Sequence, residues 1–258
     1  MTAEARQANV SKGPSAHGRM ACFDVVRGFS VVSMVLFHLC YDLRFIYGVD
    51  LAFFRPPLQD VWRASISWTF LFVAGCMCSF SRNALRRAAC YLGCAAAVFL
   101  ATTLVAVDTP ISFGIIFCMG ASTLLEHLLD ACGLTVRGIP AALACLVLFL
   151  VLRGVPMGHI GLLGHELAVP RALYATPYLS WLGFPGPGFA SGDYYPVIPF
   201  TLMYLCGAAM GRHFAEVGYP SWVYSVHCKP LELVGRHSLV IYVLHQPLLL
   251  LACQVLLP

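Results

Sequence analysis

Apolar runs of helical length recur along the whole chain and are separated by short polar stretches. A helix needs about 20 residues to cross the roughly 30 Å hydrocarbon core of a bilayer. Runs of about this length predict seven membrane-spanning helices, at residues 28–47, 64–81, 88–107, 110–129, 138–153, 196–212 and 237–257. The fold class expected is therefore all-α, a polytopic membrane helix bundle.

Segment 154–195 interrupts this pattern. It is rich in glycine and proline, which break regular helices, and its apolar pieces are too short to cross a bilayer in the usual way. We predict that residues 154–195 form an outer loop or a re-entrant segment, with Tyr174, Tyr178 and Trp181 at headgroup depth. Two short additional spans, giving nine in all, are the alternative, and they would preserve the sidedness of the other spans.

Composition and charge indicate a membrane protein with its amino terminus in the cytoplasm. Only 11% of the 258 residues are charged and 59% are hydrophobic, whereas about a quarter of the residues in a soluble domain are charged. With the amino terminus inside, most of the 16 Lys and Arg residues lie on the cytoplasmic side, in agreement with the positive-inside rule. Residues 1–18 lack the apolar core of a signal peptide. We expect them to be a disordered cytoplasmic tail before a single domain at residues 19–258.

Cysteine usage and charge patterning exclude two classes of ligand. The 12 cysteines lie mostly within apolar runs, where a free thiol packs as a small apolar group. No Cys-x-x-Cys pair is present, so we expect no metal. The net charge is only +4 and no basic cluster is interleaved with aromatic residues, so we expect no nucleic acid as a partner.

Two ionisable residues, His38 and Asp42, lie inside the first apolar run. Residues four apart share one face of a helix. An ionisable group at membrane depth costs at least a few kcal/mol, so a retained pair is a candidate functional site. In such a dyad the carboxylate orients one imidazole nitrogen and leaves the other free to accept a proton. The alternative is a buried hydrogen bond that only ties helices together.

A second imidazole, His245, lies in the last apolar run, nine residues beyond the arginine of the motif at residues 235–238. At 1.5 Å per residue its depth resembles that of His38, which suggests a polar cavity between the two. Pro247 frees the backbone carbonyl four residues before it, and that carbonyl needs a donor at this depth. The alternative to a polar cavity is a structural role, in which His245 or Gln246 supplies that donor.

Arginines gather at the predicted cytoplasmic ends of the helices. Arg27 has Asp24 three residues before it on the same face, and an arginine near a helix end can also extend to lipid phosphates. Arginines at these positions fix topology, or they form a basic collar that binds a phosphorylated carrier. The collar consists of Arg82, Arg86, Arg87, Arg212 and Arg236.

Asp193 and Tyr194 precede the sixth predicted span on the outer side. Asp193 is suited to cap the amino end of that helix, which is a common role for aspartate. The same carboxylate is suited to contact an amine or hydroxyl of a substrate that arrives from outside.

Three motifs in this chain together resemble a known group of enzymes. They are Asp24-x-x-Arg27-Gly28 followed by Phe37-His38, the run at residues 193–199, and the run at residues 235–247. Their order and content are similar to those of the multi-pass membrane acyltransferase superfamily. Within it they resemble the bacterial branch related to heparan-alpha-glucosaminide N-acetyltransferase. The resemblance extends from about residue 19 to the end of the chain.

The resemblance implies an enzyme that takes acetyl from cytoplasmic acetyl-CoA and passes it to a sugar amine or hydroxyl reached from the other side. Arg19, Arg27 and His38 match the arginine and histidine positions of the superfamily. By that analogy His38 is the general base, or alternatively a transient acyl carrier, and Asp42 orients it. The loop at residues 44–63 has no histidine where the animal lysosomal enzyme uses one. This departure argues against heparan-type substrates.

The residues and the resemblance together predict a role for each group, as follows. His38 and Asp42 are catalytic, and the acceptor contacts Asp193, Tyr194, His245 and Gln246. The coenzyme A thioester contacts Arg19, Arg27, Arg82, Arg86, Arg87 and Arg236. Membrane lipid is a further partner, a homodimer is allowed, and the implied location is the bacterial cytoplasmic membrane.

Two other classes of function compete with this interpretation. In a small proton-coupled transporter, His38, Asp42 and His245 would form a proton relay. Such transporters often contain a repeated half, and the sequence shows no internal repeat. The third alternative is a scaffold or assembly factor that retains an inactive site.

Overall fold

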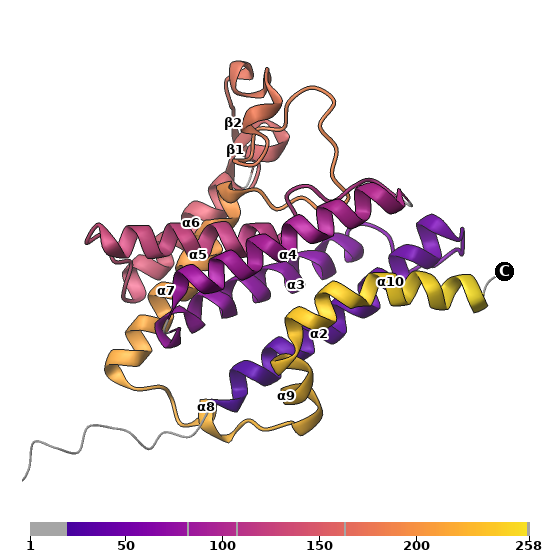
Figure 1. Cartoon of the computed structure of the whole chain (residues 1–258). Coiled ribbons are helices and arrows are strands. Elements are labelled where there is room, and N and C mark those ends of the chain that lie inside the picture. Colours follow the sequence, from indigo (N-terminus) through magenta and orange to yellow (C-terminus); the bar gives the residue numbers. More distant parts are fainter. Residues whose placement is uncertain (1–19, 82, 107, 163, 257–258) are drawn as a thin grey trace, which may run out of the picture.

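The computed structural model describes residues 20–81, 83–106, 108–162 and 164–256, and these form a bundle of helices with one small hairpin (Figure 1). The predicted tail at residues 1–18 lies outside the described residues, as do Arg19 and Arg82. The long helices are α2 (Ala21–Tyr41), α3 (Leu58–Cys76), α4 (Ala84–Val105), α5 (Ile115–Ala131), α6 (Ile139–Leu152), α7 (Val197–Val217) and α10 (Ser238–Leu256).

Each of the seven predicted spans overlaps one of these helices, so the all-α bundle is confirmed. Five described segments are long and apolar enough to cross a membrane: Ala21–Ile46, Leu58–Phe80, Ala84–Val105, Ile139–Met157 and Ser238–Leu256. The other two helices are α5, which has 17 residues, and α7, which has the largest set of buried residues of any described helix. A helix that faces other helices rather than lipid does not need a uniformly apolar surface.

Short elements extend or connect the long helices. Asp42–Ile46 (η1) continues α2 as a π-helical turn, and Met77–Phe80 (η2) continues α3 as a 3₁₀ turn. Trp222–Ser225 (α8) and Lys229–Arg236 (α9) lead into α10. The motif at residues 235–238 therefore spans the break between α9 and α10 rather than only opening the last span.

Segment 154–195 contains a β-hairpin and three 3₁₀ turns in its described residues. Strands β1 (His159–Leu162) and β2 (His165–Ala168) pair antiparallel, and the turns are η3 (Val155–Met157), η4 (Arg171–Tyr174) and η5 (Pro177–Leu179). Figure 1 shows this segment projecting from the helices. None of these elements has more than four residues, whereas a span needs about 20, so the two additional spans are not formed here. The hairpin itself was not predicted.

Helices α3 and α7 touch through their backbones. A Cβ atom added at Gly75 would clash with the carbonyl of Tyr204, and one added at Gly207 would clash with the carbonyl of Phe72. Gly211 lies against the carbonyl of Cys76 in the same way. Small residues allow this close approach, which is a common way to pack helices in a membrane.

Helices α2 and α9 cross at equally close range, and both contributing glycines belong to the sequence motifs. A Cβ at Gly28 would clash with the carbonyl of Leu231, and a Cβ at Gly235 would clash with the carbonyl of Asp24. Two motifs that are some 200 residues apart along the chain are therefore in direct contact. This crossing fixes the start of α10 against the start of α2.

Candidate active site

The two membrane-depth imidazoles are in contact. Nε2 of His245 lies 3.2 Å from Nδ1 of His38, and the ring centroids are 4.8 Å apart. Nδ1 of His38 also lies 3.0 Å from the carbonyl oxygen of Met34, and Nδ1 of His245 lies 2.6 Å from the carbonyl oxygen of Tyr242. The sequence predicted a similar depth for His38 and His245, and the structure places the two rings against each other.

Asp42 pairs with Gln246 instead of His38. Nε2 of Gln246 donates to Oδ1 of Asp42 over 2.8 Å. The hydrogen bonds of His38 within the described residues go to Met34 and His245, so the contact predicted between His38 and Asp42 is not formed. Asp42 begins the π-helical turn η1, a widened turn of a kind often found at functional sites.

The carboxyl–amide pair has spare acceptors. Asp42 is fully buried, and its Oδ2 atom and the Oε1 atom of Gln246 have no hydrogen-bond partner among the described residues. A buried polar atom without a partner costs free energy, so both atoms are suited to receive a donor. His38 differs, because its ring is only half-buried and its Nε2 atom has no partner in the described part of the chain.

A cavity of about 300 Å³ enters the bundle from the end that carries Arg27 and Arg87. This volume is at the lower limit for sites that bind small molecules and cofactors. The cavity extends between α3, α4, α5 and α10, and its lining includes Tyr91, Ile116 and Tyr242.

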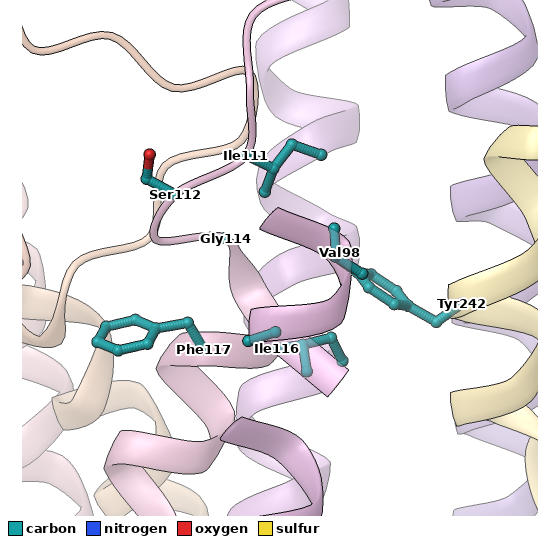
Figure 2. A pocket seen from close by; sticks show the side chains of 8 residues that line it. Val98, Ile111, Ser112, Gly114, Ile116, Phe117 and Tyr242 are labelled. Carbon is teal, nitrogen blue, oxygen red and sulfur yellow. The ribbon is translucent and has the colours of Figure 1, made fainter. Parts of the chain in front are cut away.

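A second, much smaller cavity of about 10 Å³ adjoins the first. Both cavities are lined by Ile116 and Tyr242, and Figure 2 shows the Tyr242 side chain reaching from α10 toward α4 and α5. On α4 the linings continue from Arg87 and Tyr91 to Ala95 and Val98, which follow one face of the helix. The two cavities therefore share Ile116 and Tyr242 in their linings, and we call the line of residues along both of them the route.

Tyr242 also connects this route with the imidazoles. Its ring centroid lies 5.7 Å from that of His245, and its carbonyl oxygen accepts a hydrogen bond from Nδ1 of His245. The ring of His38 is the next one beyond His245. The cavity thus ends one side chain away from the imidazole pair.

Arg27 and the arginines of the predicted collar divide into groups with different surroundings. Arg27 and Arg87 line the cavity, whereas Arg86 is exposed outside it. Arg27 lies 3.5 Å from Asp24. Arg87 donates to the hydroxyl of Tyr204 over 2.8 Å, and it has no carboxylate partner within 4 Å among the described residues.

The other two described collar arginines are neutralised by acidic side chains. Arg236 lies 3.1 Å from Glu232 and 3.7 Å from Asp24. Arg212 forms an ion pair with the buried Glu126 and lies 3.5 Å from Asp130. These arginines hold helices together at the basic end of the bundle. We define that end by Arg27, Arg87, Arg212 and Arg236.

Asp193 caps a helix, but it is not the helix that the sequence predicted. Its Oδ2 atom accepts from the backbone N–H of Ile115, the first residue of α5, over 3.1 Å. The residue before Ile115 is Gly114, which has no side chain for the purpose, so the cap comes from the loop before α7. Burial raises the pKa of Asp193 to about 6, and the hydrogen bond from Ile115 opposes that rise.

Tyr194 is similarly occupied within the protein. Its hydroxyl donates to the carbonyl of Ser180 over 2.6 Å. Nearby, the backbone N–H of Ser112 donates to the hydroxyl of Ser191 over 3.1 Å, and Ser112 lines the smaller cavity. The run at residues 191–195 therefore supports the end of the route that lies opposite the basic end. Among the described residues, no group of three His, Cys, Asp or Glu side chains could hold a metal ion.

Sequence reasoning missed Tyr242 and Tyr91 as cavity residues. Tyr242 lies three residues before His245, on the same face of a helix, so the spacing alone would have associated the two. Tyr91 likewise lies four residues after Arg87. Aromatic residues in an apolar span usually only pack, and nothing in the sequence separates these two from the others.

One of the comparisons with known proteins gives a match. A family model described as "Heparan-alpha-glucosaminide N-acetyltransferase, catalytic" matches residues 19–247. The matched range contains both imidazoles, Asp42, the basic end and the run at residues 191–195. Comparisons with curated proteins and with solved structures give no match.

Proposed function

Since the chain belongs to the heparan-alpha-glucosaminide N-acetyltransferase catalytic family, a family of transmembrane acetyltransferases, we propose that it transfers acetyl from acetyl-CoA to an amine or hydroxyl group. The donor enters from the basic end. The acceptor is a sugar or amine that is reached from the opposite end or within the membrane. Membrane lipid surrounds the bundle, and the proposed location is the bacterial cytoplasmic membrane.

The observation that carries this proposal is the cavity between Arg87 and Tyr242. A half-buried guanidinium without a carboxylate partner favours an anionic ligand, and arginine recognises phosphate with charge-assisted hydrogen bonds. Arg27 lines the same cavity. Coenzyme A carries phosphates at one end and a thioester at the other. Its phosphates would lie at the arginines while its thioester points toward Tyr242 and the imidazole pair.

The proposed chemistry needs one base and no external oxidant or reductant. Nε2 of His38 takes the proton from the acceptor nitrogen or oxygen while that atom attacks the thioester carbonyl. The tetrahedral intermediate then collapses, the carbon–sulfur bond breaks, and the proton on His38 passes to the sulfur to give free coenzyme A. A positioned base of this kind accelerates a reaction by about 100- to 10,000-fold.

The acceptor groups named from the sequence take different parts in this proposal. Asp42 and Gln246 have unsatisfied acceptor atoms that suit the N–H or O–H groups of an acceptor. Asp193 and Tyr194 are bonded to the protein's own backbone, so they act by holding the end of the route in shape.

The contacts argue against the proton-coupled transporter. A relay through His38, Asp42 and His245 needs each group to hand a proton to the next. His245 donates to the carbonyl of Tyr242, which cannot pass a proton on, and Asp42 bonds to an amide. His38 and His245 are in contact, but the link between Asp42 and His38 that the expected relay needs is not formed.

The test uses purified protein, radiolabelled acetyl-CoA and a pool of sugar and amine acceptors. We expect coenzyme A to raise the unfolding temperature and label to appear in one acceptor. Glucosamine and an N-blocked sugar in separate pools distinguish nitrogen from oxygen as the attacking atom. A protein that coenzyme A does not stabilise, and that labels no acceptor, would contradict the proposal.

A further inference from the structure

Both ring nitrogens of His245 have a hydrogen-bond partner, and these partners determine which imidazole of the pair donates and which accepts. Nδ1 of His245 faces the carbonyl oxygen of Tyr242 at 2.6 Å. A carbonyl only accepts, so Nδ1 carries the proton. In the neutral ring the other nitrogen, Nε2, then has the lone pair.

The protonation of His38 follows from two neighbouring acceptors, this lone pair and a backbone carbonyl. Nδ1 of His38 lies 3.2 Å from Nε2 of His245 and 3.0 Å from the carbonyl oxygen of Met34. Both neighbours are acceptors, so Nδ1 of His38 carries a proton and donates to them. The basic lone pair of His38 is then on Nε2, the nitrogen that has no partner among the described residues.

Resting on the function proposed above, we propose that His245 is a positioning residue for His38. Together with the carbonyl of Met34 it holds the proton of His38 on Nδ1, which leaves the basic lone pair on Nε2, and it stabilises the imidazolium that forms when Nε2 takes the acceptor proton. In that state the bond from Nδ1 of His38 to Nε2 of His245 becomes charge-assisted and therefore stronger. The stabilisation is greatest when the charge is present, which is the condition for an effect on rate rather than on binding.

The proton balance keeps His245 out of direct proton transfer. The proton that leaves the acceptor goes to Nε2 of His38 and returns from there to the sulfur of coenzyme A. Nδ1–H of His245 stays on the carbonyl of Tyr242 throughout. His245 is buried and both its nitrogens are used, so it acts through His38 and has no free polar atom for the substrate.

A purely structural role for His245 makes a different prediction. The pair Asp42–Gln246 already joins η1 to α10 one position further along. If the imidazole contact only tied the helices together, its loss would lower stability and leave the rate of the folded protein unchanged.

The experiment compares three variants of the full-length protein. His245→Gln places an amide oxygen near the Nε2 position, His245→Leu removes the acceptor, and Leu244→Ala is a control on the half-exposed neighbouring residue. We expect His245→Leu to lower kcat by about 10- to 100-fold with the KM for acetyl-CoA unchanged, and His245→Gln to stay within about threefold of the unchanged protein. Leu244→Ala should not change kcat.

A spectroscopic measurement tests the same assignment without substrate. With ¹⁵N-labelled histidine, the unchanged protein should show a scalar coupling across an N–H···N hydrogen bond between the two rings, with both protons on Nδ1. Equal kcat values for His245→Leu and His245→Gln, or a proton on Nε2 of His38, would overturn the proposal. A coupled signal in a protein that transfers no acetyl would instead contradict the proposed function while supporting the assigned protonation.

Discussion

The crossing of α3 with α7 and the crossing of α2 with α10 are built on different principles. At the first, Gly75, Gly207 and Gly211 leave no room for a side chain between the two backbones. At the second, α10 buries only His245 and Cys253 among its described residues, and it is joined to α2 by hydrogen-bonded side chains.

The difference separates rigidity from chemistry. A crossing sealed by backbone contact cannot open without loss of packing over its whole length. A crossing joined by side-chain hydrogen bonds can exchange partners one at a time, and here one ring remains partly exposed. The groups that we propose as reactive therefore lie on the crossing that is joined by side chains, while the other crossing holds the bundle together.

The strongest test of this division is His38→Ala. Removing the proposed base should lower acetyl transfer by about 100- to 10,000-fold, because a positioned base contributes that much. The free energy of unfolding should change by no more than about 1 kcal/mol, since only one hydrogen bond between helices is lost. Transfer assays and thermal unfolding of the same preparation measure both effects. Unchanged turnover would remove His38 from the mechanism.

The converse test is Gly207→Leu on the α3–α7 crossing. The new side chain meets the carbonyl of Phe72, so we expect a loss of about 2 to 3 kcal/mol in stability. Gly93→Leu is the matched control, because a Cβ at Gly93 meets nothing within 4 Å and the gain in helix propensity is the same. Chemical unfolding of the two variants gives the difference. Equal stabilities would show that this crossing is not limited by space.

A third test asks whether an arginine that lines the cavity contributes more to binding of acetyl-CoA than one outside it. Arg87→Gln removes the guanidinium that has no carboxylate partner, and the KM for acetyl-CoA should rise about tenfold with kcat nearly constant. Arg86→Gln should change KM less than twofold, because the Arg86 side chain is exposed outside the cavity. Equal effects of the two substitutions would mean that the collar acts only through its total charge.

The smallest expected effect concerns pH at the capped end of α5. Because burial raises the pKa of Asp193 from 3.8 to about 6, its contribution to stability is fully present below pH 4 and is lost as the pH rises through 6. Between pH 4 and pH 7 we expect this carboxyl to reduce stability by about 1 kcal/mol, since its side chain is partly exposed to screening. Asp193→Asn keeps an acceptor for Ile115 but does not titrate. The pH dependence of unfolding should therefore be smaller by this amount in the variant.

Much of the fold follows from local sequence features. The seven long helices coincide with apolar runs because a helix that crosses a bilayer must satisfy its own backbone hydrogen bonds. The contact between His38 and His245 could also be predicted from the sequence, since both lie at similar distances along their helices from arginines at the basic end. These inferences depend only on distance along one helix.

The remaining features depend on how helices rotate about their axes and which loops meet. Sequence spacing predicts that Asp42 lies near His38. In the structure Asp42 begins a π-helical turn and accepts a hydrogen bond from Gln246 on α10 instead. Asp193 caps α5 rather than the helix that follows it, because its loop packs against Gly114. The hairpin in segment 154–195 escaped prediction because its strands have only four residues each.

The place of Ile116 and Tyr242 in the linings of both cavities has a consequence for the membrane itself. An open aqueous pore through a bundle would short-circuit the ion gradient that the bilayer maintains. Ile116 and Tyr242 line both cavities, so their bulky side chains lie where a continuous column of water would have to pass. Under the proposed acetyl transfer, reactants from two compartments could meet at this point without an open pore between them.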